Sequence, residues 1–546
     1  MTPTRKSRWP QLSTTTLTAC VALWCLLAFN LPFWSKVLDV RPIGSLQDAL
    51  FIGSVGLFAV LVINLFLTPF SIRPVAKPAL VVILLLSSLT AYFMGTYGVL
   101  IDKVMIRNVF ETDAGEVSEL LTFKLFASVG LLGVLPSWIV IKLPLARPGW
   151  RRELLHKLVM LVVTFAGIGL VAAFFYQDQA ALLRNHREVR SLLVPVNLLG
   201  SLATYGAERA KRDLPYQAIG ADARKGPRWQ AAATTRPTVT VIVVGETARA
   251  ANFSLGGYAR ETNPDLAKIP GLVYFTDVAS CGTSTAISLP CMFSDLGRKA
   301  FSAETAKARD NLLDVLATAG LEVTWFENNS GCKGICRKVK EQRPVHVADP
   351  ELCRPDECHD EILLRELRGA LDSATGDAVI VLHTHGSHGP GYHLRYPQRF
   401  ERFKPVCREV EFQKCTVEEI VNAYDNTMLY ADHVVAGAIG VLQEYSDRFD
   451  GALLFASDHG ESLGENGLFL HGVPYALAPD YQTHVPMLFW SSPALAQRFG
   501  IDQDCLMQRR GEPLSHDNIF HSILGLLDIQ TTALKPELDL FGACRR

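Results

Sequence analysis

The sequence lacks an excess of charge of either sign. Its 546 residues include 53 Lys and Arg against 54 Asp and Glu, which gives a formal net charge of −1. A nucleic-acid partner usually requires a basic surface, so the charge balance gives no indication of one. Long hydrophobic runs are absent after Gln177, where the chain has the composition of a soluble protein. The length exceeds that of one ordinary domain, and we expect two or three.

Before Gln177, by contrast, five apolar runs are each long enough to cross a bilayer as a helix, which takes about 20 residues. The runs are Leu17–Trp34, Ala49–Thr68, Leu80–Val99, Leu120–Ile141 and Leu154–Phe175. The first is long, has no clear small-residue cleavage site and is followed by four more. We therefore interpret it as an uncleaved helix and not as a signal peptide.

Charge is almost absent from the interiors of these runs, and Lys124 lies near the end of one. Transporters usually place charged groups within their spans. The pattern therefore favours a membrane anchor over the alternative of a transporter or receptor with a ligand-binding ectodomain.

Lys and Arg are unevenly divided between the segments that connect the runs. The N-terminal tail and the second and fourth connections contain ten, and the first and third connections contain four. Basic connections stay in the cytoplasm. Five spans then carry everything after Phe175 to the outside.

Ten of the twelve cysteines follow residue 280, and eight of these fall in close pairs. Such spacing predicts disulfides in an oxidising compartment. The candidates are Cys281 and Cys291, Cys332 and Cys336, Cys353 and Cys358, and Cys407 and Cys415. A zinc ribbon is the alternative for the second and third pairs, but the irregular spacings and the outward topology favour disulfides. The sequence does not determine the partners of Cys505 and Cys544.

Three regions follow from these patterns. Residues 1–177 form a transmembrane domain of five helices. Residues 178–236 are amphipathic and then rich in Lys, Arg, Gly, Pro and Ala, and Pro195 breaks any continuous helix. We expect interfacial helices and a linker there, or a linker helix packed on the ectodomain. Residues 237–546 form the soluble domain.

Apolar strand-like runs alternate with helical patterns in residues 237–546. The strand candidates are 238–245, 321–327, 377–384, 451–457 and 484–490, and the helix candidates are 310–319, 360–373 and 417–445. This alternation predicts an α/β fold with a doubly wound, mostly parallel sheet covered on both faces. Ligands of such folds bind beyond the carboxyl ends of the strands.

Three of these strand candidates end at potential metal ligands. Glu246 follows the first. The end of the third carries His383, His385 and His388, and the fourth is followed by Asp458, His459, Glu461 and His471. A single acidic residue after a strand is usually a helix cap. Here, however, three strands carry such residues, and their ends meet at one edge of a parallel sheet, which favours a shared metal site. The combination of Glu246, Asp458 and His459 suits zinc or another borderline divalent ion and leaves a fourth position open.

The segment SCGTSTAISLPCMF, residues 280–293, encloses a group of hydroxyl side chains between two cysteines. Alone, it is typical of a helix cap within a structural disulfide loop, with Thr283 or Ser284 as the cap. Beside the predicted ligands, one of its hydroxyls can fill the fourth position. A cation stabilises an alkoxide, and a helix N-terminus attracts an anion, so the segment is also suited to carry a nucleophile.

The strings VIVVGETARAANFSLGGY, SCGTSTAISLPCMF, NNSGCKGIC, GSHGPGY and FASDHGESLGENGLFLHG follow one another in this order. Together with the five spans they resemble the membrane phosphoethanolamine transferases that modify lipid A. That group includes the mobile colistin-resistance enzymes and belongs to the alkaline-phosphatase superfamily. The resemblance covers essentially the whole chain. It implies a multi-pass protein of the bacterial inner membrane with a periplasmic catalytic domain of alkaline-phosphatase/sulfatase type.

The resemblance also implies roles for individual residues. Thr285 matches the nucleophile, and Glu246, Thr285, Asp458 and His459 match the zinc shell. His388 and His471 match residues that contact the phosphate or a second zinc, and we expect one of them to act as the general acid toward the leaving group. Matches to substrate-contacting positions are Ser330, Lys333, Asn108, Thr112 and Glu116. The string HTHGSHGP has three histidines where the family needs one, so we expect His385 to be a local variation and His383 to support the strand end.

The implied activity is a zinc-dependent transfer of phosphoethanolamine from phosphatidylethanolamine to a lipid A phosphate, through a covalent intermediate on Thr285. Polymyxin and colistin resistance is its implied outcome. We expect one tightly held zinc. Whether a second zinc binds at His388 and His471 is not determined by the sequence. A membrane-anchored phosphoglycerol transferase of the same superfamily is the alternative. A sulfatase is disfavoured, because the string CGTST lacks the Pro and Arg of a Cys-x-Pro-x-Arg nucleophile stretch.

Overall fold

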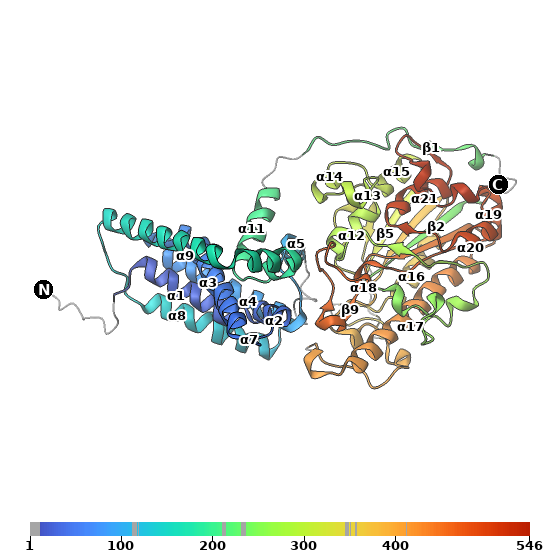
Figure 1. The fold of residues 1–546 in the computed structure, drawn as a ribbon. Helices are drawn as coiled ribbons and strands as arrows, with labels where there is room; N and C mark the ends of the chain where they lie inside the picture. Colours follow the sequence, from blue (N-terminus) through green and yellow to red (C-terminus); the bar gives the residue numbers. More distant parts are fainter. Residues whose placement is uncertain are drawn as a thin grey trace. The chain divides into compact units, whose positions relative to one another are not determined.

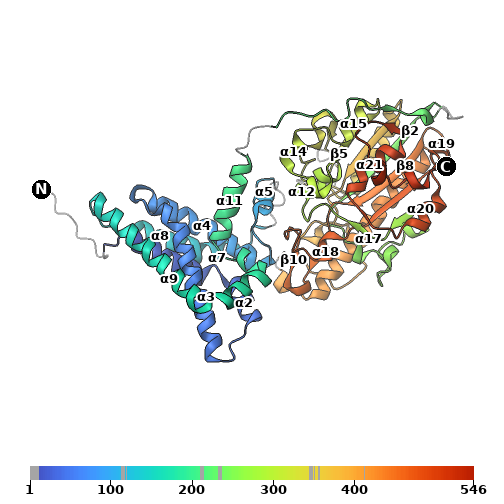
Figure 2. The ribbon, with the colours of Figure 1, turned by 45° about the horizontal axis from the view of Figure 1, so that its top comes forward.

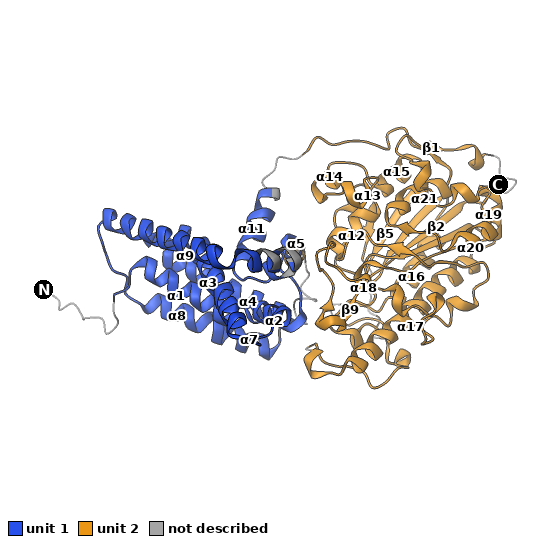
Figure 3. Cartoon of the chain, viewed as in Figure 1, with its two compact units in different colours: residues 1–106, 120–209 blue, residues 107–119, 210–546 orange. Residues whose placement is uncertain are grey.

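The computed structural model describes residues 11–111, 117, 120–209, 214–230, 236–343, 349, 351–354, 357–410 and 412–546. The chain divides into two compact units, coloured separately in Figure 3. Residues 1–106 and 120–209 form the first, which is helical. Residues 107–119 and 210–546 form the second, which contains a β-sheet.

The first unit contains four stretches that are long and apolar enough to cross a membrane. They are Leu46–Ser71, Arg73–Tyr97, Phe123–Lys142 and Trp150–Gln179. Their main helices are α3 (Leu46–Leu67), α4 (Arg73–Tyr97), α7 (Phe123–Ser128), the π-helical η2 (Val129–Val134), α8 (Leu135–Lys142) and α9 (Trp150–Asn185). Helix α3 packs against α9, and α4 packs against α8 (Figures 1 and 2). The stretches correspond to the second to fifth predicted spans.

The first predicted span is not one continuous helix. Helix α1 (Thr14–Ala28) and helix α2 (Leu31–Val40) are separated by a short break and bent by 62°. Pro32 lies in the first turn of α2, where it has no N–H to donate and its ring excludes a helical bond to the preceding turn. The side chain of Asn30 donates to the carbonyls of Cys25 and Val194, which stabilises the break.

Helix α9 continues beyond the predicted end of the fifth span, and its helical geometry is interrupted at Phe175. Two further helices follow, α10 (Arg187–Ser191) and α11 (Val196–Arg209). Pro195 lies between them, at the break that its ring predicts. Helix α5 (Lys103–Glu111) belongs to the connection between α4 and α7.

The sheet of the second unit has seven strands in the order β3-β11-β8-β2-β7-β5-β6. Their bounds are β2 (Thr238–Gly245), β3 (Val273–Phe275), β5 (Glu322–Glu327), β6 (Lys340–Gln342), β7 (Ala378–His383), β8 (Asp450–Ser457) and β11 (Met487–Ser491). Strands β8, β2, β7, β5 and β6 are mutually parallel, and β11 runs antiparallel to β8 and to β3. The predicted mostly parallel α/β sheet is confirmed, although the three-residue strands β3 and β6 were not among the strand candidates.

Helices cover both faces of this sheet (Figure 1). One face packs on the core-facing side chains of α12 (Thr285–Met292), α15 (Leu312–Thr318), α19 (Pro493–Phe499) and α21 (Asp517–Leu526). The opposite face carries α17 (Val417–Glu444), which packs against β8 and against α16 (Glu361–Ser373). Further helices are α13 (Gly297–Ala300), α14 (Ala303–Lys307), α18 (Asp480–Thr483) and α20 (Gln503–Arg509). Both faces are buried, so β2 and β8 are inaccessible to solvent along their whole length and are mostly apolar.

The strand register brings four chain segments to one edge of the sheet. Gly245 pairs with Ser457, and His383 pairs with both Val244 and Glu327. The residues that follow these strands, Glu246, Asp458, Thr384 and Asn328, therefore begin at the same height on the carboxyl edge. This is the edge where the sequence predicts the site.

Five disulfides lie in the second unit. Four are the predicted pairs, and the fifth joins Cys505 to Cys544, whose partners the sequence left open. Cys20 and Cys25, in α1, are free. The disulfide interpretation of the close cysteine pairs is thus confirmed over the zinc ribbon.

Candidate active site

Glu246, Asp458 and His459 converge at the carboxyl edge of the sheet. One ligand atom from each lies within 4.8 Å of the others. The Nε2 atom of His459 is 3.3 Å from Oε1 of Glu246 and 3.4 Å from Oδ2 of Asp458. All three residues are essentially inaccessible to solvent. The predicted association of these residues from two separate strand ends is therefore present.

The polar atoms of this cluster fit a bound cation. His459 Nδ1 lies 2.9 Å from the carbonyl of Gly460, so Nδ1 carries the proton and Nε2 faces the two carboxylates. Oδ2 of Asp458 is buried and makes no hydrogen bond to the described residues. Two carboxylates and an imidazole nitrogen around one point are the ligand types that zinc accepts.

The charges of Glu246, Asp458 and His459 also favour a cation at this point. Burial, together with the neighbouring Glu246, raises the pKa of Asp458 to about 7. Although burial opposes its charged form, the carboxylates of Asp458 and Glu246 raise the pKa of His459 to about 10. The two carboxylates therefore stabilise one positive charge beside Nε2 of His459. Either a proton on Nε2 or a metal ion bound to it can supply that charge.

Thr285 is the first residue of α12, and its side chain points into this cluster. Its Oγ1 donates to Oε2 of Glu246 at 3.0 Å and lies 3.4 Å from Nε2 of His459. Thr285 is 9% exposed, so its hydroxyl is mostly buried but still reachable from solvent. The N-terminal end of α12 also places partial positive charge beside this hydroxyl.

The segment before α12 is held at several points. Ser284 is the N-cap residue, but its side chain makes no cap hydrogen bond. Thr283, the other predicted cap, donates instead from Oγ1 to the carbonyl of Val473 at 2.7 Å, and its own carbonyl accepts from Gly472 at 2.8 Å. Together with the disulfide from Cys281 to Cys291, these bonds fix the start of α12 against the loop that carries His471.

His388 and His471 lie next to the cluster on two loops. Their ring centroids are 5.5 Å apart, and the ring of His471 is 4.3 Å from that of His459. Nδ1 of His471 lies 3.4 Å from the buried carboxyl of Glu461. Burial and the nearby His459 lower the pKa of His471 to about 3, and burial raises that of Glu461 to about 8. Both are therefore neutral at pH 7.

The predicted head-group residues Ser330 and Lys333 lie in the turn that follows β5. Nζ of Lys333 donates to the carbonyl of Ser330 at 3.0 Å and to its hydroxyl at 2.9 Å. The disulfide from Cys332 to Cys336 closes the same turn. Asn108, also predicted to contact substrate, lies in α5, while Thr112 and Glu116 lie outside the described residues.

Sequence reasoning missed Asn329, which links this turn to the cluster. Its Nδ2 donates to Oε2 of Glu246 at 2.8 Å and to the carbonyl of Thr384 at 3.0 Å. Its backbone N–H donates to Glu327 at 2.6 Å, and Glu327 also pairs with the buried His383 at 3.0 Å. The available signal was its position two residues after a strand candidate, close to the positions that identified Glu246 and Asp458.

Comparison with known proteins agrees with this geometry. Residues 238–529 match the Sulfatase family, and residues 59–210 match the family described as Phosphoethanolamine transferase EptA/EptB. The chain is 41% identical to phosphoethanolamine transferase EptA of Escherichia coli K12 over 542 residues, which cover 98% of each chain. It is 37% identical to the Escherichia coli phosphatidylethanolamine transferase Mcr-1 over 532 residues, covering 95% of this chain and 96% of Mcr-1.

A solved structure also resembles the chain over nearly its whole length. The integral membrane protein lipooligosaccharide phosphoethanolamine transferase A (EptA) from Neisseria meningitidis superposes with a TM-score of 0.93 at 38% identity, over 98% of this chain and 100% of that one. The apolar helices, the sheet with its carboxyl-edge cluster and these full-length similarities lead to one conclusion. The chain belongs to the phosphoethanolamine transferase family of the alkaline-phosphatase superfamily, whose members are inner-membrane enzymes with a periplasmic catalytic domain.

Proposed function

We propose that this enzyme transfers phosphoethanolamine from phosphatidylethanolamine to a phosphate of lipid A, and that Thr285 carries the group between the two lipids. The observation that carries the proposal is the hydroxyl of Thr285, 3.0 Å from Glu246 and 3.4 Å from His459 at the start of a helix. The name of Mcr-1 supports phosphatidylethanolamine as the donor, and that of the neisserial relative supports a lipid-linked saccharide as the acceptor.

We also propose that the cluster holds Zn²⁺ through Glu246, Thr285, Asp458 and His459, with room for a second ion at His388 and His471. The buried Oδ2 of Asp458, which makes no hydrogen bond to the described residues, and the inward-facing Nε2 of His459 support this assignment. A bound divalent cation would neutralise charge on the phosphoryl oxygens and favour the deprotonated hydroxyl.

In the first half of the reaction, Oγ1 of Thr285 forms a bond to the donor phosphorus. The proton on Oγ1 passes to Glu246, which already accepts a hydrogen bond from it. The bond between phosphorus and the diacylglycerol oxygen breaks, and that oxygen needs a proton. His388 supplies it, because imidazole is suited to proton transfer near neutral pH.

His471 has a different role. Its pKa of about 3 makes it a poor proton donor at pH 7, although the sequence placed it beside His388 as a candidate acid. A neutral Glu461 can donate to Nδ1 of His471, which leaves Nε2–H available to a phosphoryl oxygen. His471 therefore binds and orients the phosphate.

In the second half, an oxygen of the acceptor phosphate attacks the phosphorus on Thr285. The acceptor oxygen gives its proton to His388, which replaces the proton that His388 gave to diacylglycerol. The bond to Oγ1 breaks, and Oγ1 recovers its proton from Glu246. The product carries a positive amine beside the lipid A phosphate. This offsets negative charge and weakens the attraction to cationic peptides, so polymyxin and colistin resistance would follow.

Intact-mass spectrometry of the full-length protein tests the proposal. After incubation with phosphatidylethanolamine, wild type should gain the mass of one phosphoethanolamine, and Thr285→Ala should gain none. Thr283→Ala is the matched control, because that hydroxyl contacts Val473 and not the cluster, and it should be labelled. A gain from phosphatidylglycerol instead would make a phosphoglycerol transferase the better assignment. Labelling of Thr285→Ala would contradict the assignment of the nucleophile.

A further inference from the structure

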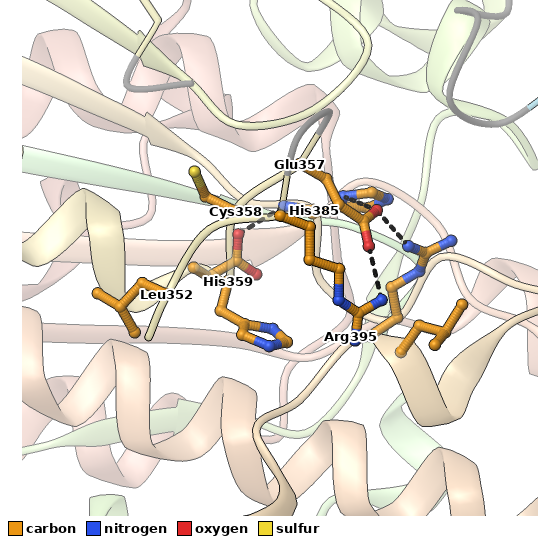
Figure 4. Close-up of a pocket in the computed structure, with 9 residues that line it drawn as sticks. Leu352, Glu357, Cys358, His359, His385 and Arg395 are labelled. Carbon is orange, nitrogen blue, oxygen red and sulfur yellow. Dashed lines mark hydrogen bonds and ion pairs between the residues drawn. The ribbon is translucent and has the colours of Figure 1, made fainter. Parts of the chain in front are cut away.

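A small pocket lies beside the loop that carries His388 and is lined in part by His385 and Arg395. None of the residues that line it takes part directly in the proposed mechanism. Figure 4 shows it with Leu352, Glu357, Cys358, His359, His385 and Arg395 labelled. It borders the loop of residues 384–390, which follows β7 and carries His388. The charged side chains of this pocket determine how that loop is held.

Arg395 contacts the loop directly. Its Nε donates to the main-chain carbonyl of His388 at 2.8 Å, and its Nη1 donates to Oε2 of Glu357 at 2.8 Å. Arg395 is only 4% exposed. A buried guanidinium requires a partner of opposite charge, so Glu357 holds Arg395 in the orientation that reaches His388.

Glu357 is itself held in place by its own turn. The disulfide between Cys353 and Cys358 closes this turn, and the N–H of Arg354 donates to the carbonyl of Glu357 at 2.7 Å. The guanidinium of Arg354 also donates to the Glu357 carboxylate at 3.3 Å. In Figure 4 the carboxylate of Glu357 points toward both Arg395 and His385.

A second charged group holds the other end of the loop. The carboxylate of Asp360 accepts hydrogen bonds from the backbone N–H groups of His385 at 2.8 Å and Gly386 at 2.9 Å. Asn328 donates to the same carboxylate at 2.8 Å. The loop is thus fixed by a carboxylate before His388 and by a guanidinium at His388.

We propose that Arg395, oriented by Glu357, is a positioning residue that sets the distance of the His388 ring from the phosphoryl group on Thr285. This inference deepens the proposed function and rests on the role of His388 in it. Arg395 offers two directional donors from one planar group, one for His388 and one for Glu357. A lysine at this position has a single ammonium on a flexible stem and cannot reproduce both bonds.

A double-mutant cycle in the full-length protein tests the proposal. Arg395→Lys should lower kcat/KM for phosphoethanolamine transfer by about 10- to 100-fold, as loss of such supporting partners does at metal sites. In a His388→Ala background the same change should cost less than about threefold, because the group that Arg395 positions is already gone. Arg399→Lys, at an exposed arginine paired with Glu361, is the matched control and should leave the rate unchanged.

Equal losses in both backgrounds would overturn the proposal, since Arg395 would then act without His388. An unchanged rate in Arg395→Lys would also overturn it.

Hydrogen exchange gives a readout that does not depend on activity. The peptide covering residues 384–391 should exchange faster in Arg395→Lys, while residues 458–472 stay protected, and no local difference would contradict the proposal. Absence of transfer by wild type would instead refute the proposed function. Hydrogen exchange of residues 384–391 would then decide whether Arg395 positions the His388 loop.

Discussion

The two halves of the active site are held in different ways. The half formed by Glu246, Asp458 and His459 follows directly from paired parallel strands, and it is fully buried. The half formed by His388 and His471 lies on loops that keep some exposure to solvent. The backbone hydrogen bonds between β2 and β8 set the geometry of the first half. The second half depends on side chains from other elements, such as Arg395 and Asp360, which hold its loop in place.

This difference separates two tasks. A cation site with two buried carboxylates must be rigid, because a misplaced carboxylate would be left charged and unpaired. In the proposed reaction the histidine half must admit two different lipids in turn, and so it cannot be enclosed to the same degree. Substitutions in the first half should therefore abolish function, and substitutions around the second should reduce it in steps.

The largest effect is expected for Asp458→Asn. The amide removes one of the two carboxylates that attract a cation, so bound zinc should fall to less than a tenth of the wild-type amount and transfer by at least about 1,000-fold. Metal analysis of the purified protein and a transfer assay measure these two quantities. Asp447→Asn, at an exposed position just before β8, is the control. Wild-type zinc content in Asp458→Asn would show that the cluster is not the tight site.

A smaller effect is expected from pH. His459, with a pKa of about 10, carries a proton that zinc must displace throughout the neutral range, and Asp458, with a pKa of about 7, adds a second proton below pH 7. Zinc affinity should therefore fall by about tenfold per pH unit from 8 to 7, and more steeply from 7 to 6. Competition with a fluorescent chelator measures this slope. An affinity that does not change with pH would contradict the proton-for-metal exchange.

The smallest effect is expected for Gly386→Ala, in the His388 loop. Gly386 has φ +55°, and a Cβ there would lie 2.6 Å from the carbonyl of Glu246. Relief of this contact must displace the loop, at a cost of about 1 to 3 kcal/mol, and we expect transfer to fall several-fold with zinc content unchanged. Thermal unfolding and the transfer assay measure the two effects. Gly376→Ala, where a Cβ meets nothing within 4 Å, should change neither.

The sequence was most informative where function follows directly from a strand. Glu246 and Asp458 could be identified because each comes immediately after a continuous apolar run, and parallel strands bring such positions together. The same logic applies to Asn329 after β5, but an amide is a weaker chemical signal than a carboxylate. Thr285 depended on the family resemblance, since three neighbouring hydroxyl residues compete for its role in residues 283–288.

The supporting residues could not be predicted in the same way. Arg395 and Asp360 act on the His388 loop through tertiary contacts, and nothing in their local sequence distinguishes them from surface charges. The bend between α1 and α2 was missed for a related reason. Composition measures how apolar a segment is, whereas Pro32 and the hydrogen bonds of Asn30 determine where its helix ends.

The strand order has a consequence for how the enzyme matures. Glu246 lies at the end of the first strand of the sheet to be synthesised, and Asp458 and His459 follow β8, near the end of the chain. Because β8 pairs directly with β2, the central strands close only after the later one has been delivered across the membrane. A partly translocated chain that lacks β8 has no complete ligand set, so a metal bound at the proposed site would have to be acquired in the periplasm, after β8 has been delivered.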